Sequence, residues 1–293
     1  MDADLELLLV SVFCTADDLL PEPRKNAQRR LSDAEVLTLC VAQVIMDLPS
    51  DRRFLRAARR QLRELFPYLP TQSALHKRRV ALRETFDWLC GVFAERSPGA
   101  RDPVVLVDST PVEAGRSVDT SRRSALADAA GYGYSRSHSH SRWFWGFRLH
   151  FACSPDGTPR AAMLVGADRK ERDIARDHLL PRLAGQATTI VCDKGYASRE
   201  LAEQAAELGL TIIRPRRADE PKSRYRLRLS TIRQRIESVF WTMKDLLSLE
   251  KHGARTLPNL RARIGCRLLC LAACVNLNHQ LCRPSRSLAP YTA

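Results

Sequence analysis

The feature that most constrains the fold is a change of hydrophobic pattern at the break Ser97-Pro98-Gly99-Ala100. Before this break, apolar residues recur at helical spacing; after it, they form short runs typical of buried strands. Adjacent Pro and Gly favour a chain break rather than a continuing element. A chain of 293 residues suits about two domains. We therefore predict a helical domain over residues 1–96 and an α/β domain with C-terminal helices over residues 101–282.

The first domain is predicted to be entirely helical. Ser32 and Glu35 form a capping-box pattern ahead of an apolar-periodic segment. After the turn at Pro67–Pro70, apolar spacing predicts an amphipathic helix over residues 72–93. The polar side of its first turns carries the candidate DNA contacts Lys77, Arg78 and Arg79. This arrangement is compatible with helix-turn-helix DNA binding, and an ordinary helical bundle is the alternative.

The second domain shows the alternation of strands and helices that predicts a mixed sheet. The predicted strands cover residues 104–107, 144–153, 160–165, 188–192 and 211–213. The predicted helices cover residues 171–183, 198–208 and 230–248. Pro155-Asp156-Gly157 is a strong turn signal, so the second and third strands should form a hairpin. Residues 109–141 are polar and are predicted to form a loop.

Three carboxylates are the candidate catalytic and metal-binding residues. Asp108 and Asp193 each follow an apolar strand, and Glu237 shares a narrow helical strip with Arg233 and Lys244. Carboxylate oxygens are hard ligands that suit Mg²⁺ or Mn²⁺. The alternatives are aspartates that cap turns and an ordinary ion pair across one helical turn.

These segments resemble those of bacterial insertion-sequence transposases of the DDE type. The resemblance lies in Val104–Ser109, Asp193–Tyr196 and Arg233–Phe240 with Lys244, although Ser230 stands where the family signature has Tyr. It implies a ribonuclease-H-like mixed sheet flanked by helices and preceded by an all-helical DNA-binding domain. It also implies binding to terminal inverted repeats, two-metal cleavage of DNA and joining of the 3′-hydroxyl ends to target DNA. The expected partner state is a homodimer in the synaptic complex.

The charge distribution agrees with a polyanionic partner. The net charge is +14, and residues 21–83 and 214–235 carry net charges of +8 and +7. The tract from Arg214 to Arg228 is therefore predicted to follow DNA, with a solvated connector as the alternative. The candidate DNA contacts of the second domain are Arg233, Lys244, Lys194, His138, His140, Arg142, Trp143, Arg216, Arg217, Arg224 and Arg226.

Two other functions fit the same residues: a catalytically inactive DNA-binding regulator and a host nuclease on the same fold. No apolar run reaches the roughly 18 residues that a membrane-spanning helix needs. The acidic start (Asp2, Asp4, Glu6) does not suit a secretory signal, and nine cysteines without close pairing suit a reducing compartment. We therefore expect a cytoplasmic protein with no membrane partner.

Overall fold

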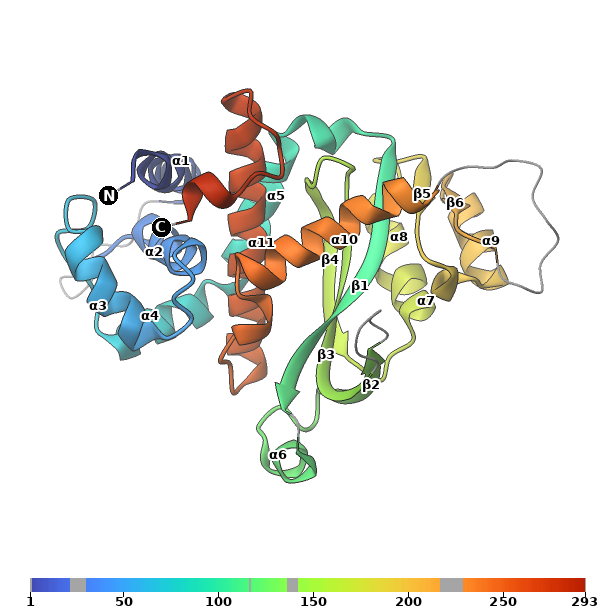
Figure 1. Ribbon diagram of the computed structural model, residues 1–293, viewed down its shortest axis with the longest axis horizontal. Coiled ribbons are helices and arrows are strands. Elements are labelled where there is room, and N and C mark those ends of the chain that lie inside the picture. The colour runs from blue at the N-terminus through green and yellow to red at the C-terminus, as the bar shows by residue number, and fades with distance from the viewer. Residues whose placement is uncertain (1, 22–29, 116, 136–141, 217–228, 293) are drawn as a thin grey trace. The chain divides into compact units, whose positions relative to one another are not determined.

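The computed structural model describes residues 2–21, 30–115, 117–135, 142–216 and 229–292 (Figure 1). The chain forms two compact units. The helical unit consists of Met1–Phe93 and Thr242–Ala293, and the sheet unit consists of Ala94–Trp241. The sequence-based division groups the C-terminal helices with the sheet, whereas the structure packs the last long helix against the N-terminal ones. Along the chain, the residues of the sheet unit thus lie between the two segments that form the helical unit.

The described residues of the helical unit form five N-terminal helices and one long C-terminal helix. They are α1 (Ala3–Leu19), α2 (Asp33–Ile45), α3 (Asp51–Gln61), α4 (Gln72–Ala81), α5 (Arg83–Glu95) and α11 (Leu257–Gln280). The predicted capping box is confirmed: Ser32 Oγ accepts from the Glu35 amide at 3.0 Å, and the Glu35 carboxylate accepts from the Ser32 amide. The single helix predicted over residues 72–93 is in fact α4 and α5, which meet at Leu82. Neither Gly nor Pro marks this junction in the sequence.

Helix α11 forms the centre of the helical unit. It contacts α1, α2 and α4, and nearly every residue from Asn259 to Asn278 is buried. Cys266, Cys270 and Cys274 are all fully or almost fully buried on it, as expected for small apolar side chains. No helix among the described residues has the length and apolar character to cross a membrane.

The sheet unit has a mixed sheet of six strands. They are β1 (Val104–Gly115), β2 (Gly131–Ser135), β3 (Arg142–Cys153), β4 (Pro159–Gly166), β5 (Thr189–Val191) and β6 (Thr211–Ile213). The order is β2-β3-β1-β5-β6, and β4 also pairs with β3. Strands β1, β3 and β4 are antiparallel neighbours, whereas β5 and β6 run parallel to β1. This confirms the predicted fold class, a ribonuclease-H-like mixed sheet with helices and a preceding all-helical segment.

Part of the predicted loop over residues 109–141 is regular structure. Strand β1 continues to Gly115 because it pairs with β3 along its whole later half, and β2 pairs with the start of β3. A short helix, α6 (Val118–Arg123), lies between β1 and β2. Long-range pairing therefore overrides the polar composition of this segment.

Helices cover both faces of the sheet. One face packs against a π-helical turn at Ala175–Leu179, α8 (Leu180–Leu183) and α9 (Arg199–Glu207), and α7 (Glu171–Ile174) directly precedes the π-helical turn. The other face meets α10 (Leu229–Asp245), where Phe240 packs on Phe151 of β3 with ring centroids 6.1 Å apart. Figure 1 shows α10 crossing β1. The sheet thus has one helical layer on each side.

Candidate active site

The register of β1 and β5 places Asp108 and Asp193 at equivalent positions. Leu106 of β1 pairs with Val191 of β5 in a parallel ladder, and each aspartate follows two residues later. Because side chains alternate along a strand, Asp108 lies on the same face as its cross-strand neighbour Phe151, which faces α10. Strand β1 continues to Gly115, so Asp108 does not end the strand as predicted. Asp108 lies just past the end of the parallel pairing with β5.

Both aspartates are held by the backbone amides that follow them. Asp108 Oδ1 accepts from the Ser109 amide at 2.8 Å, and Asp193 Oδ1 accepts from the Lys194 amide at 2.6 Å. The pKa of Asp108 is raised to about 7, mainly by burial. The nearby charges of Glu171 and Asp193 also raise the pKa, whereas the Ser109 hydrogen bond and the Arg233 charge oppose the rise. A raised pKa of this kind marks a site where negative groups are crowded out of water.

Helix α10 brings a cation and the third carboxylate to this edge of the sheet. Ile236, Val239 and Phe240 are buried, and this buried side fixes the rotation of the helix. Arg233 Nη1 lies 3.4 Å from Asp193 Oδ1, and Arg233 Nη2 lies 3.6 Å from Glu237 Oε1. One guanidinium therefore bridges the carboxylates of β5 and α10.

The donor set suits a hard divalent cation, but the side chains are not arranged as a metal cage. Within the described ranges, no three His, Cys, Asp or Glu residues are grouped closely enough to hold a metal ion. Arg233 lies between Asp193 and Glu237, and its guanidinium group provides the positive charge between these two carboxylates. Carboxylate oxygens from two strands and a helix are the ligands that Mg²⁺ and Mn²⁺ prefer.

A second polar group beside Asp108 was not identified from the sequence. Ser109 Oγ donates to Glu171 Oε1, and Arg148 Nη1 lies 3.2 Å from both of these oxygens. The hydroxyl of Tyr196 is buried without a hydrogen-bond partner in the described structure, and burial together with the charges of Glu171 and Asp108 raises its pKa. The sequence around Glu171 does not indicate its position beside Asp108, because the partners of Glu171, Ser109 and Arg148, are distant in the chain.

The remaining predicted contacts of the sheet unit differ in accessibility. Lys194 is exposed, and Arg216 is exposed at the start of the basic tract. Trp143 is 71% exposed and meets Tyr134 edge to face, with centroids 5.3 Å apart. Arg142 is paired with Glu113. The other predicted contacts, His138, His140, Arg217, Arg224 and Arg226, lie outside the described residues.

Lys244 belongs to the helical unit and not to the sheet unit. Its ammonium group pairs with Glu250 at 3.0 Å, close to the C-terminal end of α10. The predicted strip on this helix is thus shared by the two units, with Arg233 and Glu237 in the sheet unit. The role of Lys244 in holding phosphate stays a prediction.

The structure corrects one of the three predicted DNA contacts on α4. Arg79 is only 1% exposed, and its Nη2 pairs with Asp51 at 2.9 Å, so it is not available to DNA. Arg78 is partly buried and binds Asp33 at 2.6 Å, whereas Lys77 is exposed. Helical spacing could not show which side of α4 the neighbouring helices cover.

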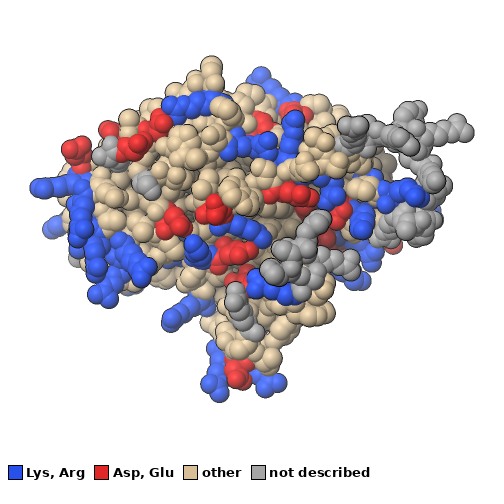
Figure 2. Space-filling model, viewed as in Figure 1, with Lys and Arg blue, Asp and Glu red and all other residues tan. Residues whose placement is uncertain are grey.

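Helix α3 carries more exposed cations than α4. Its apolar side chains Phe54 and Leu55 are buried, and its arginines lie on the opposite side. These exposed residues are Arg52, Arg53, Arg56, Arg59 and Arg60. Figure 2 shows Lys and Arg side chains gathered over α3 and α4. The arginines between apolar residues were visible in the sequence, but no single one could be selected.

Comparison with known proteins identifies the family. A family model described as "Transposase DDE domain" matches residues 99–273, more than half of the chain. No curated protein sequence matches the chain. Among solved structures, the chain is similar to one titled "Crystal structure of a pre-cleavage Mos1 transpososome", with 13% identity, coverage of 87% of this chain and 80% of that chain, and a TM-score of 0.21. The family match alone carries the assignment, and it confirms the resemblance to DDE transposases: the chain belongs to the transposase DDE domain family, and the protein is a DNA transposase.

Proposed function

We propose that this transposase binds the terminal inverted repeats of its own mobile element, cleaves phosphodiester bonds by two-metal hydrolysis and joins the 3′-hydroxyl ends to target DNA. The observation that carries the proposal is the alignment of Asp108 and Asp193 on neighbouring parallel strands, with Arg233 linking Asp193 to Glu237. Asp108, Asp193 and Glu237 are the proposed metal ligands.

The proposed cofactor is Mg²⁺ or Mn²⁺, and DDE transposases generally use a divalent metal. When bound, a pair of such ions activates a hydroxyl nucleophile and stabilises the leaving oxygen. The raised pKa of Asp108 supports this assignment, because its main cause is burial of the carboxylate and a minor cause is the negative charge of Glu171 and Asp193, and a bound cation would offset both effects. Glu171 is held away from this role by Ser109 and Arg148 and instead maintains the polar surroundings of Asp108.

The proposed DNA contacts surround the carboxylates. Arg233 and the exposed Lys194 would hold phosphate oxygens, and the exposed Trp143 would stack on an unpaired base. Arg216 begins the tract that we propose follows the DNA backbone. The helical unit would supply end recognition through its basic helices, and two copies of the chain would join the two ends of the element.

Cleavage and joining assays with the element's flanking DNA test this function. Asp108→Asn, Asp193→Asn and Glu237→Gln each keep the side-chain volume and remove a ligand charge. We expect cleavage with Mg²⁺ to fall more than about a hundredfold, because loss of groups that merely support metal ligands already costs 10–100-fold. Binding to end DNA should be retained. Asp128→Asn and Glu207→Gln, at exposed positions of the same unit, are matched controls.

The same assay separates the three candidate functions. A wild-type protein that binds the ends but does not cleave with any divalent metal would be a DNA-binding regulator. Cleavage without strand joining would indicate a nuclease. A ligand variant that cuts at the wild-type rate would remove that residue from the proposed site.

A further inference from the structure

The helical unit contains a hollow of about 700 Å³ that the active site does not use. Its walls come from the turn before α3, the first turns of α4, the segment after Leu249–Lys251 and the start of α11. Its charged and polar lining includes Asp51, His76, Lys251, Arg255, Asn259 and Arg263. His76, Lys251 and Arg255 are exposed at this hollow, whereas Asn259 and Arg263 are 6% and 7% exposed. Cations therefore outnumber the one carboxylate.

The start of α11 gives the hollow a positive dipole end. Thr256 is the N-cap residue and forms no side-chain capping hydrogen bond in the described structure. The helix runs for 24 residues from Leu257, and Thr256 and Asn259 both line the hollow. The first amide groups of a helix and its dipole together favour an anion, most of all when no side chain caps them.

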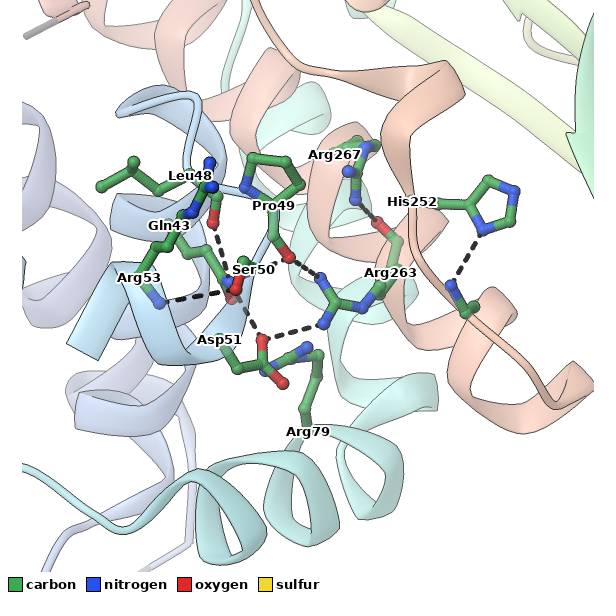
Figure 3. Close-up of polar contacts among 11 residues, drawn as sticks. Gln43, Leu48, Pro49, Ser50, Asp51, Arg53, Arg79, His252, Arg263 and Arg267 are labelled. Atoms are coloured by element: carbon green, nitrogen blue, oxygen red, sulfur yellow. Dashed lines mark hydrogen bonds and ion pairs between the residues drawn. The ribbon is translucent and has the colours of Figure 1, made fainter. Parts of the chain in front are cut away.

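A buried polar group at the hollow supplies a second and independent indication of a ligand. Arg263 donates to the Pro49 carbonyl at 3.0 Å and to Asp51 at 2.8 Å (Figure 3), and Arg79 donates to the same carboxylate. The Nε atom of Arg263 and the Oδ1 atom of Asn259 have no partner among the described residues. One carboxylate thus serves two guanidinium groups, which leaves excess positive charge beneath the hollow.

Asp51 does not cancel this charge. Burial raises the pKa of Asp51, but the charges of Arg79 and Arg263 outweigh this effect and hold the pKa below its usual value. The carboxylate is therefore ionised and fully engaged by the two arginines. Lys251 has only a loose contact with Asp47 at 3.8 Å, with both side chains largely exposed, so this pair competes weakly for the Lys251 ammonium group.

We propose that this hollow binds a backbone phosphate of duplex DNA, with Lys251 and Arg255 as the contacting side chains. Helix α3 begins at Asp51 in the wall of the hollow and carries five exposed arginines, so the phosphate site continues a basic surface. This inference rests on the proposed function, because it assumes that the helical unit binds DNA. It adds to that function a contact from the C-terminal part of the chain, which the sequence-based division places in the other domain.

The salt dependence of binding to random-sequence duplex DNA tests the proposal. The full-length double variant Lys251→Gln/Arg255→Gln is compared with the wild type by fluorescence anisotropy between 50 and 200 mM salt. Each lost phosphate contact reduces the slope of log affinity against log salt by about 0.9. For the one phosphate of the hollow, the affinity loss over this fourfold range should be about 3.5-fold smaller in the variant. Arg101→Gln/Arg199→Gln removes the same charge from exposed positions of the sheet unit and is the matched control.

A charge-preserving variant and the DNA sequence separate the outcomes. Lys251→Arg/Arg255→Lys should keep the wild-type slope, which a purely structural role of these residues would not require. A slope that is equal in the wild type and in the glutamine variant, or equally reduced in the control, would overturn the proposal. A wild-type protein that binds random duplex but does not prefer element ends would refute end recognition. The comparison of salt slopes would still show whether the hollow binds a phosphate.

Discussion

Replacement of His150 by Leu should remove a large part of the acid sensitivity of the sheet unit. His150 lies in β3, is 0% exposed, and neither ring nitrogen has a partner in the described structure. Its pKa is lowered to about 4, mainly by burial, and the positive charges of Arg148 and His178 act in the same direction. The folded protein therefore holds this imidazole neutral in an apolar setting.

The sign of the effect follows from proton linkage. With an ordinary pKa of 6.5 in the unfolded chain and about 4 in the folded chain, the unfolded state binds more protons between these values. Stability is therefore fully retained above pH 6.5 and is lost as the pH falls toward 4. At pH 4 the linked loss is about 3 kcal/mol, since one pKa unit corresponds to about 1.4 kcal/mol.

Urea unfolding at several pH values measures this contribution. Hydrogen exchange of peptides covering residues 142–153 follows the sheet unit separately from the helical unit. The wild type should lose about 3 kcal/mol more than His150→Leu between pH 7 and pH 4. At pH 7 the variant should be as stable as the wild type or more so, because two unpartnered buried nitrogens are removed. His76→Leu, at an exposed position, is the control. Parallel pH profiles for the wild type and His150→Leu would refute the reasoning.

Two further predictions concern the aromatic surface and the buried ion cluster. Trp143→Ala should leave the melting temperature unchanged and weaken binding to single-stranded DNA by about 1–3 kcal/mol. Trp88→Ala, which replaces another exposed tryptophan, is the control and should not weaken this binding. Equal losses of affinity in the two variants would exclude stacking by Trp143. Asp51→Asn should destabilise the protein by about 3–5 kcal/mol in thermal unfolding, because Arg79 and Arg263 lose their only shared carboxylate. An Asp51→Asn melting curve matching that of the wild type would show that these arginines need no anion.

The sequence predicts the carboxylates of the site well because their signal is local. Asp108 and Asp193 each follow an apolar run, and the helical spacing of Arg233 and Glu237 places them on one face. The same local information is silent about Glu171, which meets Ser109 from 62 residues away. Which carboxylates surround Asp108 is therefore decided by strand pairing and helix packing rather than by local pattern.

The sequence-based predictions are wrong where the burial or pairing of a residue depends on distant segments of the chain. Arg79 looks like a surface cation on a basic helix, yet it is buried because Asp51, 28 residues earlier, provides a counter-charge. Strand β1 extends through polar residues because β3 pairs with them. The sequence could not show that α11 packs in the helical unit, because the apolar surface of α11 has no feature that distinguishes one packing partner from another.

The insertion of the sheet unit within the helical unit sets the order in which the protein can fold during translation. Helices α1–α5 leave the ribosome before the sheet unit, but their central partner α11 begins only at Leu257. At about 5–20 residues per second, the 161 residues between Glu95 and Leu257 take roughly 8–32 s to synthesise. During this delay the surfaces of α1, α2 and α4 that α11 later covers are open to solvent. The nascent chain should therefore complete its sheet first, and chaperones should be needed most for the segment that is made earliest.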